Sequence, residues 1–135
     1  MLTDRMRLAF SIDNLYAGFA KVTGIIRVVN DNLSLEFETK DNLLGGVLKS
    51  KPKQVNIPLL DIESVTLKKS WFSTKLIVRV LKLGTLNEIP GTEKGEAILK
   101  LRRKERKTAE TLISKINFRI SELGLDPHER GEGLY

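Results

Sequence analysis

The chain has 135 residues, of which 41% are hydrophobic and 30% are charged, and this balance is typical of one folded domain. It contains no cysteine, which excludes disulfides, thiolate nucleophiles and Cys-ligated zinc or iron–sulfur sites. The net charge of +6, from 23 Lys and Arg against 17 Asp and Glu, favours phosphate-bearing or acidic partners as well as solubility.

Alternating apolar residues predict strands along most of the chain. Residues 6–12 alternate like a strand, while residues 13–19 could form a turn of helix. Residues 20–29 and 33–39 alternate on either side of residues 30–32, whose Asn-Asp-Asn sequence has turn chemistry. These two segments therefore predict the clearest hairpin of the chain.

Further strands are expected after a long connection at 41–53. Residues 54–60 alternate, and Pro58 places this short strand at a sheet edge or at a bulge. Residues 61–69 and 74–83 form the next two strands. Because the second of them carries apolar residues on both faces, we expect both faces to be at least partly covered.

The apolar period changes from two to 3.6 residues at about Lys104, after a last strand at 96–102. One long helix with a single apolar stripe follows, formed by Ala109, Leu112, Ile113, Ile116, Ile120 and Leu123. Gly124 is suited to end this helix. About seven strands and one amphipathic helix predict an α+β fold, in which a strongly bent antiparallel sheet or open barrel is closed by the C-terminal helix.

The run "IPLLDIESVTLKKSWFSTKLIVRV", followed by "IPG", "GEAILKL" and "RKTAETLISKI", resembles the pleckstrin-homology-like superfamily, and within it the GRAM-type and bacterial domains. The resemblance covers about residues 19–123 and implies a single PH-like domain over 1–135, with 1–18 as an N-terminal extension and 124–135 as a flexible tail. It also implies a binding module without catalytic activity or cofactor, because members bind phosphoinositides, other anionic lipids, peptides or partner proteins.

Phosphoinositide-binding members of that superfamily carry a basic cluster on the first two strands and in the loop between them. The loop matched here, "VVNDNLSLEFE" at 28–38, contains the acidic Asp31, and two glutamates lie on the strand after it. The basic cluster is absent. High-affinity headgroup recognition by that route is therefore not expected, because convergent Lys and Arg contacts supply most of the attraction to a polyphosphate.

The single tryptophan of the chain lies in a turn between two predicted strands. Trp71 and Phe72 are flanked there by Lys68, Lys69 and Lys75. The aromatic pair could insert at a membrane interface while each lysine contributes ~1 kcal/mol near anionic lipid. The alternative is that an aromatic side chain folds back over the barrel rim and the lysines are only solvated. Burial of a large aromatic is worth ~2–3 kcal/mol, so we favour this alternative.

A second basic region, "KLRRKERK" at 100–107, contains the start of the predicted helix. Clustered cations at a helix N-terminus can bind an anion, although the macrodipole disfavours them there. We favour the alternative, a solvated segment whose charges pair with Glu105 and Glu110. The remaining candidates for an anion or lipid contact are Lys49, Lys51, Arg103, Lys104 and Lys107.

Phe118 lies opposite the apolar stripe of the helix, so it should be exposed unless the strand around Phe10, the tail residues Leu134 and Tyr135, or a second copy covers it. It is the candidate contact for an alternative function, a protein-interaction or homo-oligomerising domain that uses a sheet edge or the outer helix face. Nucleic-acid binding is less favoured, because basic and aromatic residues do not interleave on one strand face.

Catalysis has little support in the sequence. The single histidine, His128, follows the helix and has no evident partner for a triad or a metal site. We therefore expect a binding protein without catalytic, metal or cofactor residues. No apolar run approaches the ~20 residues of a membrane span and no signal region is evident, so we expect a cytoplasmic location, with a peripheral membrane contact as one option.

Overall fold

The computed structural model describes residues 6–15, 18–41, 48–49 and 51–124. Its eight strands are β1 (Leu8–Leu15), β2 (Ala20–Val29), β3 (Asn32–Asp41), β4 (Leu48–Lys49), β5 (Lys53–Pro58), β6 (Ile62–Lys69), β7 (Thr74–Val80) and β8 (Glu96–Leu101). The helix α1 spans Arg106–Gly124, and short 3₁₀ turns occupy Leu59–Asp61, Leu83–Leu86 and Arg103–Glu105. Within the described residues no helix is long and apolar enough to cross a membrane.

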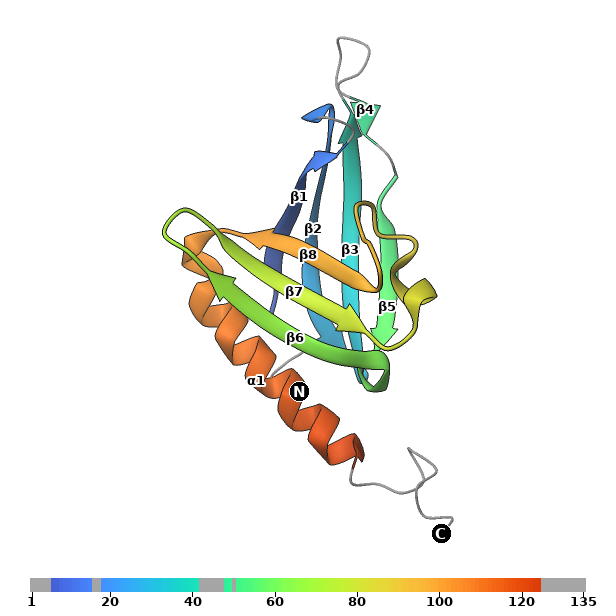
Figure 1. Cartoon of the computed structure of the whole chain (residues 1–135), viewed down its shortest axis with the longest axis vertical. Helices are drawn as coiled ribbons and strands as arrows, with labels where there is room; N and C mark the ends of the chain where they lie inside the picture. The colour runs from blue at the N-terminus through green and yellow to red at the C-terminus, as the bar shows by residue number, and fades with distance from the viewer. Residues whose placement is uncertain (1–5, 16–17, 42–47, 50, 125–135) are drawn as a thin grey trace.

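The strands form one antiparallel sheet in the order β4-β3-β2-β1-β8-β7-β6, and β5 pairs with β3 beside β4. In Figure 1, β6, β7 and β8 cross in front of the layer made by β1, β2 and β3, and α1 runs along the open side beside β6. The sheet is not closed, because β5 and β6 follow each other in the chain without pairing. The prediction of an open, bent antiparallel sheet with one C-terminal helix is confirmed at this level.

The β2–β3 hairpin has the predicted form. Its ladder runs from Ala20↔Asp41 to Val29↔Asn32 without a register shift. Asn30 and Asp31 close the turn with φ of 48° and 62°, a left-handed conformation that Asn and Asp tolerate better than most residues. The turn chemistry of the sequence is therefore sufficient to explain the tight connection.

The core lies between the two parts of the sheet and the helix. The predicted inward residues of the strands are buried, and α1 buries Ala109, Leu112, Ile116 and Leu123 of its predicted stripe. Ile113 and Ile120 are partly buried and pack against the same cluster. The helix contributes to folding, because without its apolar face the open side of the sheet would be exposed to water.

Two expectations about the strands are wrong. Residues 13–15 belong to β1 and not to a helical turn, and β1 lies between β2 and β8 with its Leu8 and Phe10 in the core. The strand expected at 74–83 is also shorter than predicted, and the expected cover of its second face is wrong at two residues. Leu81 and Leu83 follow the end of β7 and are 61% and 71% exposed.

Several other expectations can be placed on the structure. Pro58 ends β5, which has β3 as its strand partner, so the prediction of an edge position is confirmed. The long connection at 41–53 is interrupted by the two-residue strand β4, and residues 42–47 of it lie outside the described residues. The predicted tail and His128 also lie outside them.

Candidate functional site

The turn between β6 and β7 places two aromatic side chains in solvent. The last cross-strand pair is Lys69↔Thr74, and beyond it the backbone N–H of Ser70 donates to the carbonyl oxygen of Ser73 at 2.8 Å. Trp71 and Phe72 occupy the two central positions of this turn, and they are 76% and 90% exposed. We call these two residues the aromatic tip.

The favoured prediction that an aromatic residue of the turn folds back over the barrel rim is therefore wrong. The backbone N–H of Ser73 donates to Oγ of Ser70 at 3.1 Å, so the four-residue turn is closed by its own polar groups. Its central residues stand beyond the last pair of the ladder, and their exposure shows that neither packs on the core. The free energy that burial of an aromatic side chain would contribute, on which the prediction depended, is therefore not gained.

An arginine of α1 holds the turn in place. Nε of Arg106 donates to Oγ1 of the fully buried Thr74, and its Nη2 donates to the carbonyl oxygens of Ser70 at 2.6 Å and Ser73 at 3.4 Å. A second link is the ion pair between Nζ of Lys69 and Oε1 of Glu110, at 2.9 Å. The aromatic tip is thus presented by a turn that is already ordered, which lowers the entropic cost of binding.

Three lysines lie side by side on the outer face of β6, β7 and β8. Lys68 is paired across the strands with Lys75, and Lys75 with Lys100, and we call these residues the lysine row. Each directly opposed pair of like charges destabilises a sheet by ~0.2–1 kcal/mol. Nζ of Lys100 contacts Oδ2 of Asp13 at 3.1 Å, but within the described residues Lys68 and Lys75 make no ion pair.

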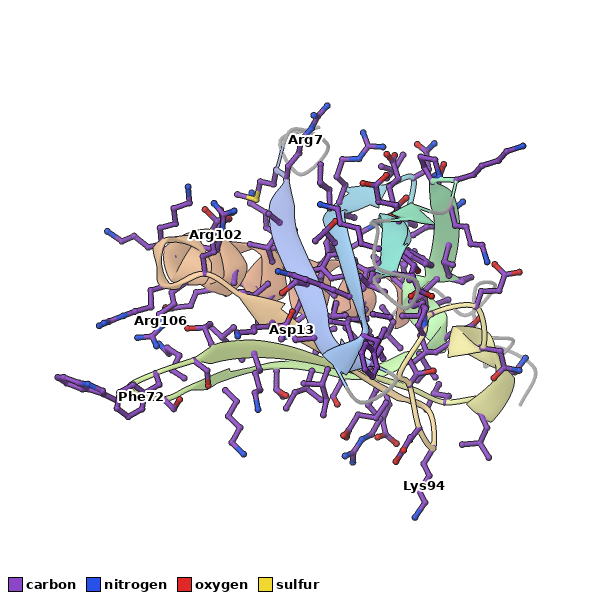
Figure 2. The ribbon with its side chains drawn as sticks, turned by 90° about the horizontal axis from the view of Figure 1, so that it is seen from above. Arg7, Asp13, Phe72, Lys94, Arg102 and Arg106 are labelled. Carbon is purple, nitrogen blue, oxygen red and sulfur yellow. The ribbon has the colours of Figure 1, made fainter. Side chains whose placement is uncertain are left out.

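The segment between β8 and α1 adds further positive charge beside the tip. Arg102, Arg103, Lys104 and Lys107 are exposed and have no ion-pair partner in the part of the chain that the structure describes. The predicted solvation of this segment is confirmed, but the predicted pairing with Glu110 is wrong, because Glu110 pairs with Lys69 of the hairpin. Figure 2 shows Phe72, Arg102 and Arg106 on the same side of the molecule.

A cleft of about 430 Å³ opens beside the aromatic tip, where β1 and β8 meet through one pair of residues, Ser11↔Lys100. We call it the β1–β8 cleft. Its walls come from the outer faces of β1 and β2, from the β6–β7 turn and from the end of β8. The charged and aromatic residues in these walls are Phe10, Asp13, Lys21, Phe72, Lys100, Arg102 and Arg103.

The candidate cations predicted from the sequence do not all meet at this end. Lys51 is exposed just before β5, and Lys49 belongs to β4, its side chain lying outside the described part. In Figure 1, β4 and the start of β5 are at the top, away from the β6–β7 turn at the left. The sequence reasoning considered the run 100–107, which contains Lys100 and Arg102, but did not connect it with Lys21, because their proximity depends on how distant strands pair.

The β2–β3 turn is occupied by an internal ion pair. Nε and Nη2 of Arg119 on α1 donate to Oδ1 and Oδ2 of Asp31 at 2.7 and 2.9 Å. These hydrogen bonds, and to a lesser degree the charge of Arg119, hold the pKa of Asp31 below its ordinary value, while partial burial acts in the opposite direction. The charges of Asp31 and Arg119 in this turn therefore compensate each other.

The position of this turn in the fold also corrects its assignment. Because β1 precedes β2, the loop between the first two strands is the β1–β2 connection and not residues 30–31. Residues 16–17 of that connection lie outside the described residues. Lys21, at the start of β2, is the cation of this hairpin that reaches the β1–β8 cleft.

Phe118 is 67% exposed on the outer face of α1, as the helical periodicity predicts. Phe10 does not cover it, because Phe10 is buried in the core. The neighbouring outer-face residues Ser114, Ser121 and Glu122 are polar and exposed. Phe118 is therefore a single apolar side chain in a polar surface.

Comparisons with protein-family models, with curated proteins and with solved structures find no match. The resemblance to the pleckstrin-homology-like superfamily thus stays a prediction. The fold itself is an α+β domain with an open antiparallel sheet and one C-terminal helix.

Proposed function

We propose that this chain is a non-catalytic binding module that contacts anionic membrane surfaces through the aromatic tip, with the lysine row at the level of the lipid headgroups. The observation that carries the proposal is the exposure of Trp71 and Phe72, 76% and 90%, at the end of a turn beside Lys68 and Lys75, which make no ion pair among the described residues. Trp and aromatic residues are enriched where proteins meet the membrane–water interface.

The spacing between the aromatic and basic groups supports this arrangement. Lys68 and Lys75 each lie three residues from the nearer aromatic residue, which is about 10 Å along an extended chain. The polar headgroup layer on each side of a bilayer is roughly 5–8 Å thick. The separation exceeds the thickness of that layer by a few ångströms, which a flexible lysine side chain can span, so the ammonium groups can reach the phosphates when the aromatic side chains insert just below the layer.

The energetics predict weak and reversible binding. Each Lys or Arg near an anionic surface contributes ~1 kcal/mol, and this contribution decreases with added salt. The tip offers two aromatic side chains, whose partial transfer from water adds about 1–3 kcal/mol in all. The like-charge repulsion in the lysine row, which costs stability in the free protein, would be relieved by anionic lipid.

A protein partner is less well supported as the occupant of this surface. Stable protein interfaces bury about 800 Å² on each side around a central apolar cluster. Here the apolar part consists of two side chains with cations around them, and Phe118 is isolated among polar residues. A small apolar tip within a positive surface fits an interface with lipid headgroups better than it fits a protein core.

The proposal is tested by cosedimentation with vesicles of phosphatidylcholine that contain increasing fractions of an anionic lipid. We expect binding to rise with the anionic fraction and to fall as salt is raised from 50 to 500 mM, because the attraction is screened. Equal binding to neutral and anionic vesicles, or no binding to either at low salt, would overturn the proposed function.

A further inference from the structure

The β1–β8 cleft contains one carboxylate within a positive surface. Its four cations, Lys21, Lys100, Arg102 and Arg103, and the single acid Asp13 leave a net charge of +3. Neither Arg102 nor Arg103 has an ion-pair partner within the described residues. A cleft of this charge attracts an anion, and guanidinium groups match the oxygens of a phosphate especially well.

Asp13 has an unused acceptor inside this cleft. Its Oδ2 is 3.1 Å from Nζ of Lys100, whereas Oδ1 is buried and accepts no hydrogen bond from the described residues. The nearest cation to Oδ1 is Nζ of Lys21, at 3.9 Å, beyond hydrogen-bond distance. Oδ1 has less than 1 Å² of accessible surface, so a ligand in the cleft reaches it only when the partly exposed side chain of Asp13 turns; a donor that then bonds to Oδ1 satisfies this acceptor and gains affinity.

The surroundings of Oδ1 select a neutral donor. Lys21 and Lys100 both lie close to the single carboxylate of Asp13, so a ligand ammonium group placed there would meet a net positive charge. A hydroxyl group donates the same hydrogen bond without that repulsion. The cleft therefore distinguishes a phosphate ester with hydroxyl groups from one with an amino group.

We propose that the β1–β8 cleft binds a phosphate ester that carries hydroxyl groups, of the phosphoglycerol type, with the phosphate on Arg102 and Arg103 and a hydroxyl on Asp13. The inference rests on the proposed membrane contact where the ester is a lipid headgroup. Phe72 belongs both to the aromatic tip and to the wall of the cleft, so a lipid beside the inserted tip can place its headgroup there. A free phosphorylated polyol has the same chemistry.

The two sources are separated by parallel experiments on the full chain. In the first, soluble glycerol 3-phosphate is titrated and backbone amide shifts of Ser11, Lys100 and Arg102 are followed by NMR. In the second, binding is compared between vesicles that hold equal fractions of phosphatidylglycerol or phosphatidylserine, two headgroups with the same net charge. We expect shifts confined to the cleft and a preference for phosphatidylglycerol of about 2- to 10-fold, the value of one added hydrogen bond.

Substitution of Asp13 supplies the sharpest control. Asp13→Ala raises the net charge by one and so should strengthen binding to both kinds of vesicle, yet it should abolish the preference for phosphatidylglycerol. Glu93→Ala makes the same change in charge at an exposed site outside the cleft and should keep the preference. Asp13 is partly exposed, and thermal melting shows whether the variant is folded.

The outcomes separate this inference from the proposed function. Equal binding to both anionic lipids, without shifts in the cleft, overturns the cleft as a headgroup site and leaves the membrane contact intact. Shifts with glycerol 3-phosphate but no vesicle binding overturn the membrane contact and keep the cleft, with a free ester as its ligand. A preference that survives in Asp13→Ala overturns the assigned role of Asp13.

Discussion

Two turns of the sheet, β2–β3 and β6–β7, are each held by an arginine of the same helix. They differ in charge, because the first turn is neutralised and the second stays positive. Arg106 and Arg119 lie 13 positions apart on α1, roughly 20 Å along its axis. Arg119 contacts the carboxylate of Asp31, so its charge is neutralised in the β2–β3 turn. Arg106 donates to a hydroxyl and to backbone carbonyls, so the β6–β7 turn keeps a positive charge.

The difference lies in what surrounds each arginine. The β2–β3 turn is polar, tight and balanced in charge, as expected of a connection whose role is to join two strands. The β6–β7 turn carries two exposed aromatic side chains, which lower solubility, beside the directly opposed Lys68 and Lys75, which lower the stability of the free protein. Features that are unfavourable for the isolated fold point to a surface that acts in binding.

Removal of the aromatic tip should have the largest effect. Trp71→Ala combined with Phe72→Ala should weaken binding to anionic vesicles by about 100-fold, because two inserted side chains are lost. The melting temperature should not change, since both side chains are exposed. Phe118→Ala, which removes a comparably exposed aromatic elsewhere, should bind like the wild type in the same cosedimentation assay.

Removal of the arginine that holds the tip should have the next largest effect, here on stability. Arg106→Ala should lower the free energy of unfolding by about 1–2 kcal/mol, because the buried hydroxyl of Thr74 and the carbonyl of Ser70 lose their donor. Urea denaturation followed by circular dichroism measures this change. Arg119→Ala is the matched variant at the other turn. Because its ion pair is exposed, it should lose less stability, and a larger loss of unfolding free energy than in Arg106→Ala would contradict this account.

Loss of one lysine from the lysine row should weaken membrane binding and raise the stability of the fold. Lys75→Gln should weaken binding to anionic vesicles about fivefold, the value of one cation near the surface. The same substitution should raise stability slightly, because it removes like-charge contacts with Lys68 and Lys100. Lys94→Gln changes the net charge equally at a site far from Phe72 in Figure 2. If both variants lose the same affinity, only the net charge of the protein matters.

The smallest effect should come from acid titration of the β2–β3 turn. The pKa of Asp31 is lowered in the folded state, so its contribution to stability is complete above the unfolded value of about 4 and is lost as the pH falls through the lower folded pKa. Asp31→Asn should melt about 1–3 °C below the wild type at pH 7, because the ion pair is solvent-exposed. The gap should narrow as the pH falls through the lowered folded pKa, and a gap that stays constant in acid would contradict this origin.

Local patterns in the sequence predict most of the fold. The alternation in β2, β3, β6, β7 and β8 and the apolar stripe of α1 each depend on neighbouring residues, and these elements were placed within a few residues. The opposed lysines Lys68 and Lys75 follow from the same reasoning, because they are symmetric about the β6–β7 turn. Both features depend on contacts that are short in sequence.

Features that depend on distant pairing could not be predicted. The β1–β8 cleft requires Lys100 to meet Asp13, which is 87 residues away in the chain. The exposure of Trp71 depends on whether any core surface lies within reach of the turn, and no local pattern contains that information. The role of Arg106 was missed for the same reason, since its acceptors lie more than 30 positions earlier.

The fluorescence of Trp71 tests the membrane contact most directly, because it is the single tryptophan of the chain and is 76% exposed. Addition of anionic vesicles at low salt should shift its emission to shorter wavelength, and lipids brominated near the top of the acyl chain should quench it. Neutral vesicles should produce neither effect. An unchanged Trp71 emission while the protein cosediments with anionic vesicles would show that another surface makes the contact, and would contradict the role proposed for the aromatic tip.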